Sequence, residues 1–221
     1  MKFLHTADIH WGMTPDSDKP WSRARAQAIK DTFAQVISQA KLRDVDCLFI
    51  AGDLFHRQPL VRDLKELNYL FSTIPSVRVV IIAGNHDRIR PNSALMSFVW
   101  CANVTWIMEE DMTSVYFEDL NLEVHGFSYH TAEITEPRLN KLKASLSSHI
   151  QVLLAHGGDA SHLPLDKNRL RDAGFSYVAL GHIHKPEIAP DFSYAYPGSL
   201  EPLDKTETGP HGIIAGEISP V

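Results

Sequence analysis

Five short motifs rich in Asp, His, Asn and Gly recur along the chain, and each follows a run of apolar residues. They are Asp8-Ile9-His10, Gly52-Asp53, Gly84-Asn85-His86-Asp87, His156-Gly157 and Gly181-His182-Ile183-His184. Imidazole nitrogens and carboxylate oxygens are ligands that divalent transition metals accept. The glycines let the backbone turn sharply and approach closely. The motifs therefore predict a metal centre built from segments that are far apart in sequence.

Asp53 is the best candidate for a bridging ligand, because it ends a central predicted strand between the other motifs. Two metals held about 3.5–4 Å apart need such a bridge, and a carboxylate offers two oxygens. Asp8 and His10 are then expected on one metal, and Asn85 and His156 on the other.

The spacing of His182 and His184 puts both rings on one face of an extended segment, so they are expected to reach neighbouring metals. Two divalent ions carry more positive charge than Asp8 and Asp53 can neutralise, because the other ligands are neutral. The filled centre would attract a phosphate anion. It would also lower the pKa of a bridging water toward neutrality, which makes that water the nucleophile.

His86 is not needed as a ligand and is predicted to protonate the leaving oxygen, with Asp87 holding its ring. Orientation of a ligand is the alternative role. Arg57, Arg88 and Arg90 flank the motifs as candidate phosphate contacts, and a solvated loop charge is the alternative. Six other histidines have no motif partner and are interpreted as structural or surface residues: His5, His125, His130, His149, His162 and His211.

Alternating strands and helices are expected to position the first three motifs. Apolar runs predict strands at Lys2–Ala7, Asp46–Ala51 and Val77–Ala83. Helices are predicted at Ser22–Arg43 and Val61–Phe71, where apolar residues recur with a period near 3.6. This order indicates an α/β fold with largely parallel strands, whose carboxyl ends form the ligand crevice.

Shorter elements are predicted after Pro91. Helices are expected at Ser93–Trp100, Glu136–Ser147 and Asp166–Ala173. The expected strands are Thr105–Met108, Ser114–Phe117, Leu122–Gly126, His149–Ala155, Tyr177–Leu180, Ile183–Ile188, Ser193–Tyr196 and Gly212–Ile218, the last three completing a second group. Without a repeat or linker, residues 1–221 are interpreted as one domain of two sheets packed face to face, with helices outside.

Composition restricts the binding mode, redox state and cellular location that can be expected of this chain. A net charge of -6 argues against a protein that grips nucleic acid by bulk charge, although it leaves room for a local positive site. Cys47 and Cys101 form no metal-binding pair and are interpreted as reduced thiols. The apolar start is too broken for a signal peptide, and the apolar runs are too short for a membrane span. A cytoplasmic protein is expected.

In this order, the five motifs resemble those of the calcineurin-like metallophosphoesterases. The segments His5–Gly12, Gly52–His56 and Tyr196–Ser199 are similar to the nuclease subunit of the bacterial SbcCD complex and its DNA-repair relatives. The resemblance covers about residues 1–205. It implies a four-layer α/β/β/α sandwich of two mixed sheets and a manganese-dependent DNA repair exonuclease/endonuclease.

The resemblance also implies roles for single residues. One metal would be held by Asp8, His10, Asp53 and His184, and the other by Asp53, Asn85, His156 and His182. His86 matches the proton donor, and His56 matches a histidine that handles DNA near the scissile phosphate, with a solvated loop residue as the alternative. Manganese is the expected ion, and iron or zinc also fits the mixed nitrogen and oxygen donors.

DNA, as single strands or ends, is the expected substrate. The DNA-capping domain and the segment that binds an SMC-like ATPase subunit in such nucleases are not expected within these 221 residues. A homodimer is left open. Two other functions remain as alternatives: a phosphodiesterase for a small nucleotide or diester, and a binding module that has lost catalysis. The complete ligand set argues against the second.

Overall fold

Two mixed β-sheets form the centre of the computed structural model, which describes residues 1–219. The first sheet has the order β11-β1-β2-β3-β4, in which only β11 is antiparallel to its neighbour. Its strands are β1 (Lys2–Thr6), β2 (Cys47–Ala51), β3 (Arg78–Ile82), β4 (Val104–Ile107) and β11 (Ile214–Glu217).

The second sheet has the order β5-β6-β7-β8-β10-β9. Its strands are β5 (Thr113–Phe117), β6 (Leu122–Gly126), β7 (Ile150–His156), β8 (Tyr177–Gly181), β9 (Glu187–Ile188) and β10 (Tyr194–Tyr196). The inner strands β6, β7, β8 and β10 run parallel, and the edge strands β5 and β9 run antiparallel to their neighbours.

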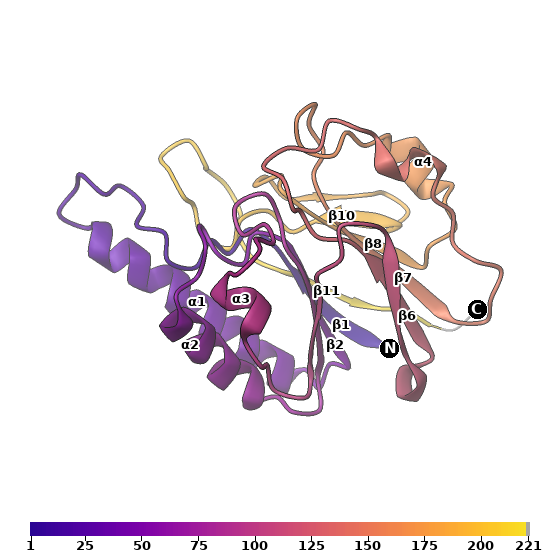
Figure 1. Cartoon of the computed structure of the whole chain (residues 1–221), viewed down its shortest axis with the longest axis horizontal. Helices are drawn as coiled ribbons and strands as arrows, with labels where there is room; N and C mark the ends of the chain where they lie inside the picture. Colours follow the sequence, from indigo (N-terminus) through magenta and orange to yellow (C-terminus); the bar gives the residue numbers. More distant parts are fainter. Residues whose placement is uncertain (220–221) are drawn as a thin grey trace.

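Helices cover the outer faces of both sheets (Figure 1). The first sheet carries α1 (Ser22–Leu42), α2 (Val61–Ser72) and the short α3 (Ala94–Ser97). On the second sheet lie α4 (Lys167–Arg171) and a 3-10 turn at Arg138–Lys141. Among the described residues, no helix combines the length and apolar character needed to cross a bilayer.

Side chains point alternately to the two faces of each sheet, which explains the layers of the fold. In β3, Val79 and Ile81 pack with α1 and α2, whereas Val80 and Ile82 belong to the core between the two sheets. Successive strand residues point to opposite faces, so β3, which is apolar from Val79 to Ile82, contributes to two cores at once. A third apolar cluster lies on the outer face of the second sheet. The predicted α/β/β/α sandwich is therefore confirmed.

One predicted strand joins the other sheet. Gly212–Ile218 was expected in the second group, but β11 pairs antiparallel with β1, placing Phe3 opposite Gly216. A Cβ at Gly216 would lie 2.5 Å from the Phe3 ring, so the glycine makes room for that ring. The apolar run alone did not show which sheet edge it would complete.

Two other predicted elements are largely absent in the structure. Of the strand expected at Ile183–Ile188, only Glu187 and Ile188 pair, because Pro186 lacks a donor and His182 has φ +90°. The helix expected at Glu136–Ser147 is a 3-10 turn at Arg138–Lys141, followed by irregular backbone. There the Gln151 amide bonds both backbone groups of Ser145, at 2.9 and 2.8 Å, in place of helical partners.

Candidate metal centre

The carboxyl ends of β1, β2, β3, β7 and β8 meet at one edge of the two sheets, where all five motifs lie. Five of their charged or polar side chains are almost completely enclosed. Asp8 and Asp87 are 0% exposed, and His10, Asp53 and His156 are each 1% exposed. Buried charged and polar groups are costly unless they are paired or hold a metal, so this concentration needs a compensating partner.

Several of these residues have a backbone conformation that is uncommon outside glycine. The φ angles of Asp8, His10 and Asp53 are 52°, 51° and 51°, and that of His182 is 90°. Left-handed conformations in non-glycine residues cost about 1–3 kcal/mol and gather at functional sites. At Asp8, His10 and Asp53 this conformation accompanies side chains that lie together.

Glycines let the neighbouring backbone approach these side chains. A Cβ on Gly84 would lie 2.2 Å from Oδ1 of Asp53, and one on Gly52 would lie 2.4 Å from Nδ1 of His156. A Cβ on Gly181 would lie 2.0 Å from the Ala51 carbonyl oxygen. Any side chain at these positions would displace a candidate ligand or the backbone.

One group of donors joins the first and last motifs. Nε2 of His184 lies 3.4 Å from Nε2 of His10 and 3.8 Å from Oδ1 of Asp8. Nε2 of His10 lies 3.8 Å from Oδ2 of Asp53. Asp8, His10 and His184 offer ligand atoms within 4.8 Å of one another, which suits a single ion.

A second group lies beside it. Nε2 of His156 is 3.3 Å from Oδ2 of Asp53 and 3.1 Å from Oδ1 of Asn85. Asp53 thus lies within 3.8 Å of a donor from each group, and its role as a bridge stays a prediction. Its other oxygen, Oδ1, accepts a bond from the His86 backbone at 2.9 Å.

The outer hydrogen bonds of two histidines fix which ring nitrogen faces the centre. The Ala51 carbonyl accepts from Nδ1 of His156 at 2.8 Å, and the Glu207 carboxylate accepts from Nδ1 of His184 at 2.6 Å. When these rings are neutral, their Nε2 lone pairs therefore point among the other donors. Lone pairs that converge in this way repel unless a cation or a proton lies between them. The donor set fits divalent ions.

The pKa values reflect the same enclosure. Burial lowers the pKa of His10 to about 3 and raises that of Asp8 to about 7. Burial would also raise the pKa of Asp53, but the charges of His156 and His10 hold it below its usual value. For His156, burial acts to lower the pKa, yet the carboxylate of Asp53 raises it to about 9. Anionic Asp53 is thus stabilised by a neighbouring positive charge.

The spacing argument for His182 and His184 assumed an extended segment, but His182 has φ +90°. Nε2 of His182 bonds Oδ2 of Asp159 at 2.7 Å, whereas Nε2 of His184 lies 3.4 Å from Nε2 of His10. The His182 and His156 rings lie side by side, with centroids 5.2 Å apart. The role of His182 on the second ion stays a prediction.

His162 was interpreted as lacking a motif partner, and this was wrong. Its Nδ1 lies 3.0 Å from Oδ1 of Asp159, so one carboxylate serves both His162 and His182. These three residues form a further group of potential metal donors.

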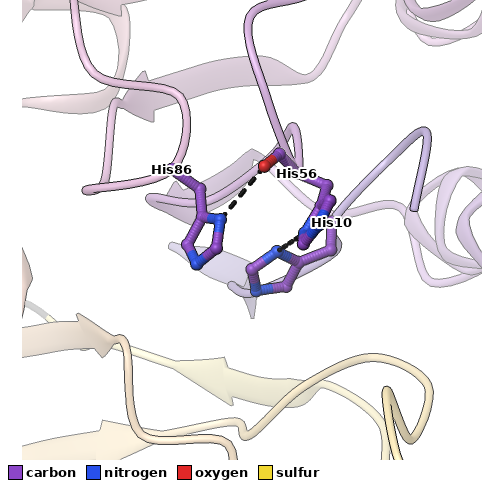
Figure 2. Close-up of side chains that lie close together, drawn as sticks. All are labelled: His10, His56 and His86. Carbon is purple, nitrogen blue, oxygen red and sulfur yellow. Dashed lines mark hydrogen bonds between the residues drawn. The ribbon is translucent and has the colours of Figure 1, made fainter. Parts of the chain in front are cut away.

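Figure 2 shows three histidines that lie close together, His10, His56 and His86. Nδ1 of His10 lies 3.2 Å from Nδ1 of His56, and Nδ1 of His86 bonds the His56 carbonyl at 3.0 Å. The expectation that Asp87 holds the His86 ring was wrong. Asp87 is fully buried, and its carboxylate accepts from the backbone of Gly84 at 2.7 Å and of Phe55 at 3.1 Å. It fixes the two loops instead of the ring.

An open cavity of about 510 Å³ adjoins these histidines. Arg57, Arg88 and Arg90 line it, against one acidic residue, Glu133. Within residues 1–219, none of these arginines forms a salt bridge. The cavity wall therefore has positive charge available for an anion. The remaining lining residues are His56, Gln58, Asn85, His86, Ala132 and His162.

Sequence reasoning missed two carboxylates of this region, Asp159 and Glu207. Asp159 follows the His156-Gly157 motif closely, so proximity in sequence was a usable signal. Glu207 lies in the loop between β10 and β11, and nothing in its local sequence distinguishes it from other surface glutamates.

Comparisons with known proteins agree with this arrangement. The calcineurin-like phosphoesterase family matches residues 1–186. A metallophosphoesterase of Bacillus subtilis, YhaO, is 28% identical over 99% of this chain and 59% of its own length. The DNA double-strand break repair protein Mre11 of Archaeoglobus fulgidus is 30% identical over 94% of this chain and 52% of its own. The chain thus spans somewhat more than half the length of these relatives.

A solved structure shares the fold. TT1561 of Thermus thermophilus is 13% identical, and the alignment covers 99% of both chains with a TM-score of 0.54. Members of the matched family bind divalent metals, in keeping with the donor groups described above. With 186 residues matched and all five motifs gathered at the strand ends, this chain belongs to the calcineurin-like phosphoesterase family.

Proposed function

We propose that this chain hydrolyses phosphodiester bonds of DNA at a centre of two divalent ions, with manganese as the native metal. The observation that carries the proposal is the convergence of donors, above all Nε2 of buried His10 and Nε2 of partly buried His184, 3.4 Å apart beside the carboxylates of Asp8 and Asp53. The Mre11 relatives, named for repair of DNA double-strand breaks, support the choice of substrate.

The two ions would share Asp53. One would be held by Asp8, His10 and His184 in addition, and the other by Asn85, His156 and His182. When bound, such a pair supplies a Lewis acid for the phosphoryl oxygen and lowers the pKa of water. The enclosed side chains keep bulk water away from the donors, which strengthens their attraction for a cation.

His86 would protonate the leaving oxygen. The His56 carbonyl can only accept a bond, so Nδ1 of His86 carries a hydrogen. Nε2 is therefore the nitrogen that gains and loses the catalytic proton. His56 would hold His86 through its carbonyl, and its own ring, half-buried beside His10, would face the scissile phosphate.

The arginines of the cavity would hold neighbouring phosphates. Arg57 and Arg88 are the proposed substrate contacts, because within the described residues neither forms a salt bridge with a carboxylate. With a net charge of -6 and a short cationic wall, the chain suits single strands or DNA ends better than intact duplex. We further propose that the protein is cytoplasmic and that this chain forms a single catalytic domain. The whole protein would have an SMC-like ATPase as its partner.

A phosphodiesterase for small nucleotides is the second candidate. The observation that favours it is the cavity of about 510 Å³ beside the centre, within the size range of small-molecule sites. Such a substrate would use the same ions and the same proton donor.

One comparison tests both candidates. Manganese-loaded protein is assayed against labelled single-stranded DNA, duplex DNA, bis-p-nitrophenyl phosphate and cyclic nucleotides, with Asp53→Asn as the control for contaminating nucleases. Cleavage of DNA that disappears in the control is the expected result. Brisk hydrolysis of cyclic nucleotides without DNA cleavage would favour the second candidate. No hydrolysis by protein shown to hold two ions would refute both.

A further inference from the structure

The carboxylate of Glu207 is held on both oxygens. Oε1 accepts from Nδ1 of His184 at 2.6 Å. Oε2 accepts from the Ser199 hydroxyl and from the Leu203 backbone, each at 2.9 Å. With only 15% of its side chain exposed, Glu207 is fixed in one orientation, and so is the ring that it bonds.

The backbone of the Tyr196–Ser199 segment also contacts the backbone of His184. The Ser199 amide donates to the His184 carbonyl at 3.1 Å. Gly198, with φ +81°, passes so close that a Cβ there would lie 2.6 Å from that carbonyl oxygen. Ser199 therefore reaches His184 twice, directly through its amide and indirectly through Glu207.

His211 closes the loop around this pair. Its Nδ1 bonds the Ser199 carbonyl at 2.9 Å, and its Nε2 lies 3.3 Å from the Glu207 carbonyl. The loop between β10 and β11 is thus folded around one carboxylate. Nε2 of His184 points to His10 and Asp8 on the opposite side of the ring.

We propose that Glu207, supported by Ser199, is a positioning residue that fixes His184 for one of the two ions. The inference rests on the proposed metal centre. The bond at Nδ1 keeps the hydrogen on that nitrogen, directs the Nε2 lone pair into the centre and increases its basicity as a donor. No contact links Glu207 to His156, Asn85 or His182 among the described residues, so its influence is confined to the ion that His184 holds.

Glu207→Ala tests this, with Glu201→Gln as the matched control. Glu201 lies in the same loop, but its carboxylate accepts from the Thr32 hydroxyl, away from the centre. Loss of an outer hydrogen-bond partner typically weakens metal affinity about 10–100-fold. Manganese titration of the full chain, followed by calorimetry and electron paramagnetic resonance, should show one of two ions weakened by that amount and the other unchanged. Glu207→Gln, which keeps an acceptor oxygen, should lose less.

Two further measurements separate positioning from a purely structural role. In the metal-free chain, proton NMR should show a strongly downfield imidazole N–H signal of His184 that is absent in Glu207→Ala. Thermal unfolding of metal-free Glu207→Gln, which keeps an acceptor oxygen for Ser199 and Leu203, should remain close to that of Glu201→Gln. Equal loss of both ions, or two ions bound with unaltered affinity in Glu207→Ala, would overturn the inference.

The proposed function and this inference can fail separately. Unaltered protein that binds no pair of ions would refute the metal centre itself. The imidazole signal needs no metal, so its persistence in Glu207→Ala would by itself refute the contact on which Glu207 is assigned.

Discussion

The centre has two parts of different construction, which we call the floor and the rim. The floor consists of Asp8, His10, Asp53 and His156, each at most 1% exposed and located at or shortly after the carboxyl end of a strand. The rim lies in loops and is partly or fully exposed; it consists of His56, Arg57, His86, Arg88 and Asp159.

This difference separates two tasks. Floor side chains are held by backbone bonds and crowding glycines, as when the His182 amide donates to both oxygens of Asp8 at 3.1 and 2.9 Å. They have no room to adapt to a substrate, which suits the proposed task of holding ions. All rim side chains except that of Asp159 line an open cavity, where they can meet substrates of different shape. Changes in the floor should abolish the centre, whereas changes in the rim should alter rate or selectivity.

The largest effect is expected from Asp53→Asn in the floor. The exchange removes the carboxylate next to both donor groups, so both ions should be lost together with activity. Outer partners alone change metal affinity about 10–100-fold, so a lost bridging ligand should exceed that range. Metal analysis after desalting measures the loss, with the exposed Asp18→Asn as control. A variant with two ions and ordinary turnover would contradict the bridging role and the division into floor and rim.

His86→Ala should have the next largest effect, and a different one. Both ions should remain bound, because the His86 ring contacts the His56 carbonyl and no floor carboxylate. Hydrolysis of DNA should slow by about 10²–10⁴-fold, the usual contribution of a general acid. The loss should shrink with a nitrophenolate leaving group, which needs little protonation.

Paired rates on DNA and on bis-p-nitrophenyl phosphate provide that measurement. His149→Ala, which removes a histidine beside Tyr116 on the second sheet, is the control. Equal losses on both substrates would argue that His86 binds phosphate or orients its neighbours.

The floor could be located from sequence because its residues are tied to strand ends. An apolar run that ends in Asp8 or Asp53 predicts both the strand and the edge at which the side chain emerges, and parallel strands bring such edges together. Close packing by Gly52 and Gly84 follows from the same motifs. The first three strands were predicted to within two residues from their apolar runs, and the two long helices were predicted as closely from their periodicity.

The loops could not be predicted in this way. Asp87 stands beside His86 in sequence, yet its carboxylate turns to the backbone of Gly84 and Phe55, a pairing set by two loops meeting in three dimensions. The partnership of Asp159 with His182 likewise depends on a turn and on φ +90° at His182. Neither pairing is accompanied by a periodic pattern of apolar residues, so the sequence gives no signal of it.

A smaller effect is expected from Arg57→Ala in the rim. Arg57 is exposed at the cavity, so losing it should weaken DNA binding and leave the ions and kcat nearly unchanged. A single lost phosphate contact should reduce the slope of log affinity against log salt by about one. Arg43→Ala, at the opposite end of α1 from the strand ends, controls for net charge. An equal change in both variants would show that Arg57 acts only through overall charge.

The smallest effect is expected from Asp159→Asn, which tests whether exposure divides floor from rim. Its carboxylate bonds His182 at 2.7 Å, much as Glu207 bonds His184 at 2.6 Å. The two carboxylates differ in exposure, at 47% for Asp159 and 15% for Glu207. Water competes for an exposed pair, whose contribution is about 0–1 kcal/mol, or at most about fivefold in affinity.

Manganese titration should therefore show the second ion weakened at most a few-fold in Asp159→Asn, well below the effect of Glu207→Ala on the first. His162→Ala, which removes only the other partner of Asp159, should leave that affinity unchanged because the His182 bond remains. If Asp159→Asn instead cost as much as Glu207→Ala, the geometry of the bond, and not its enclosure, would determine how firmly a ligand is held. His182 and its carboxylate would then belong to the floor.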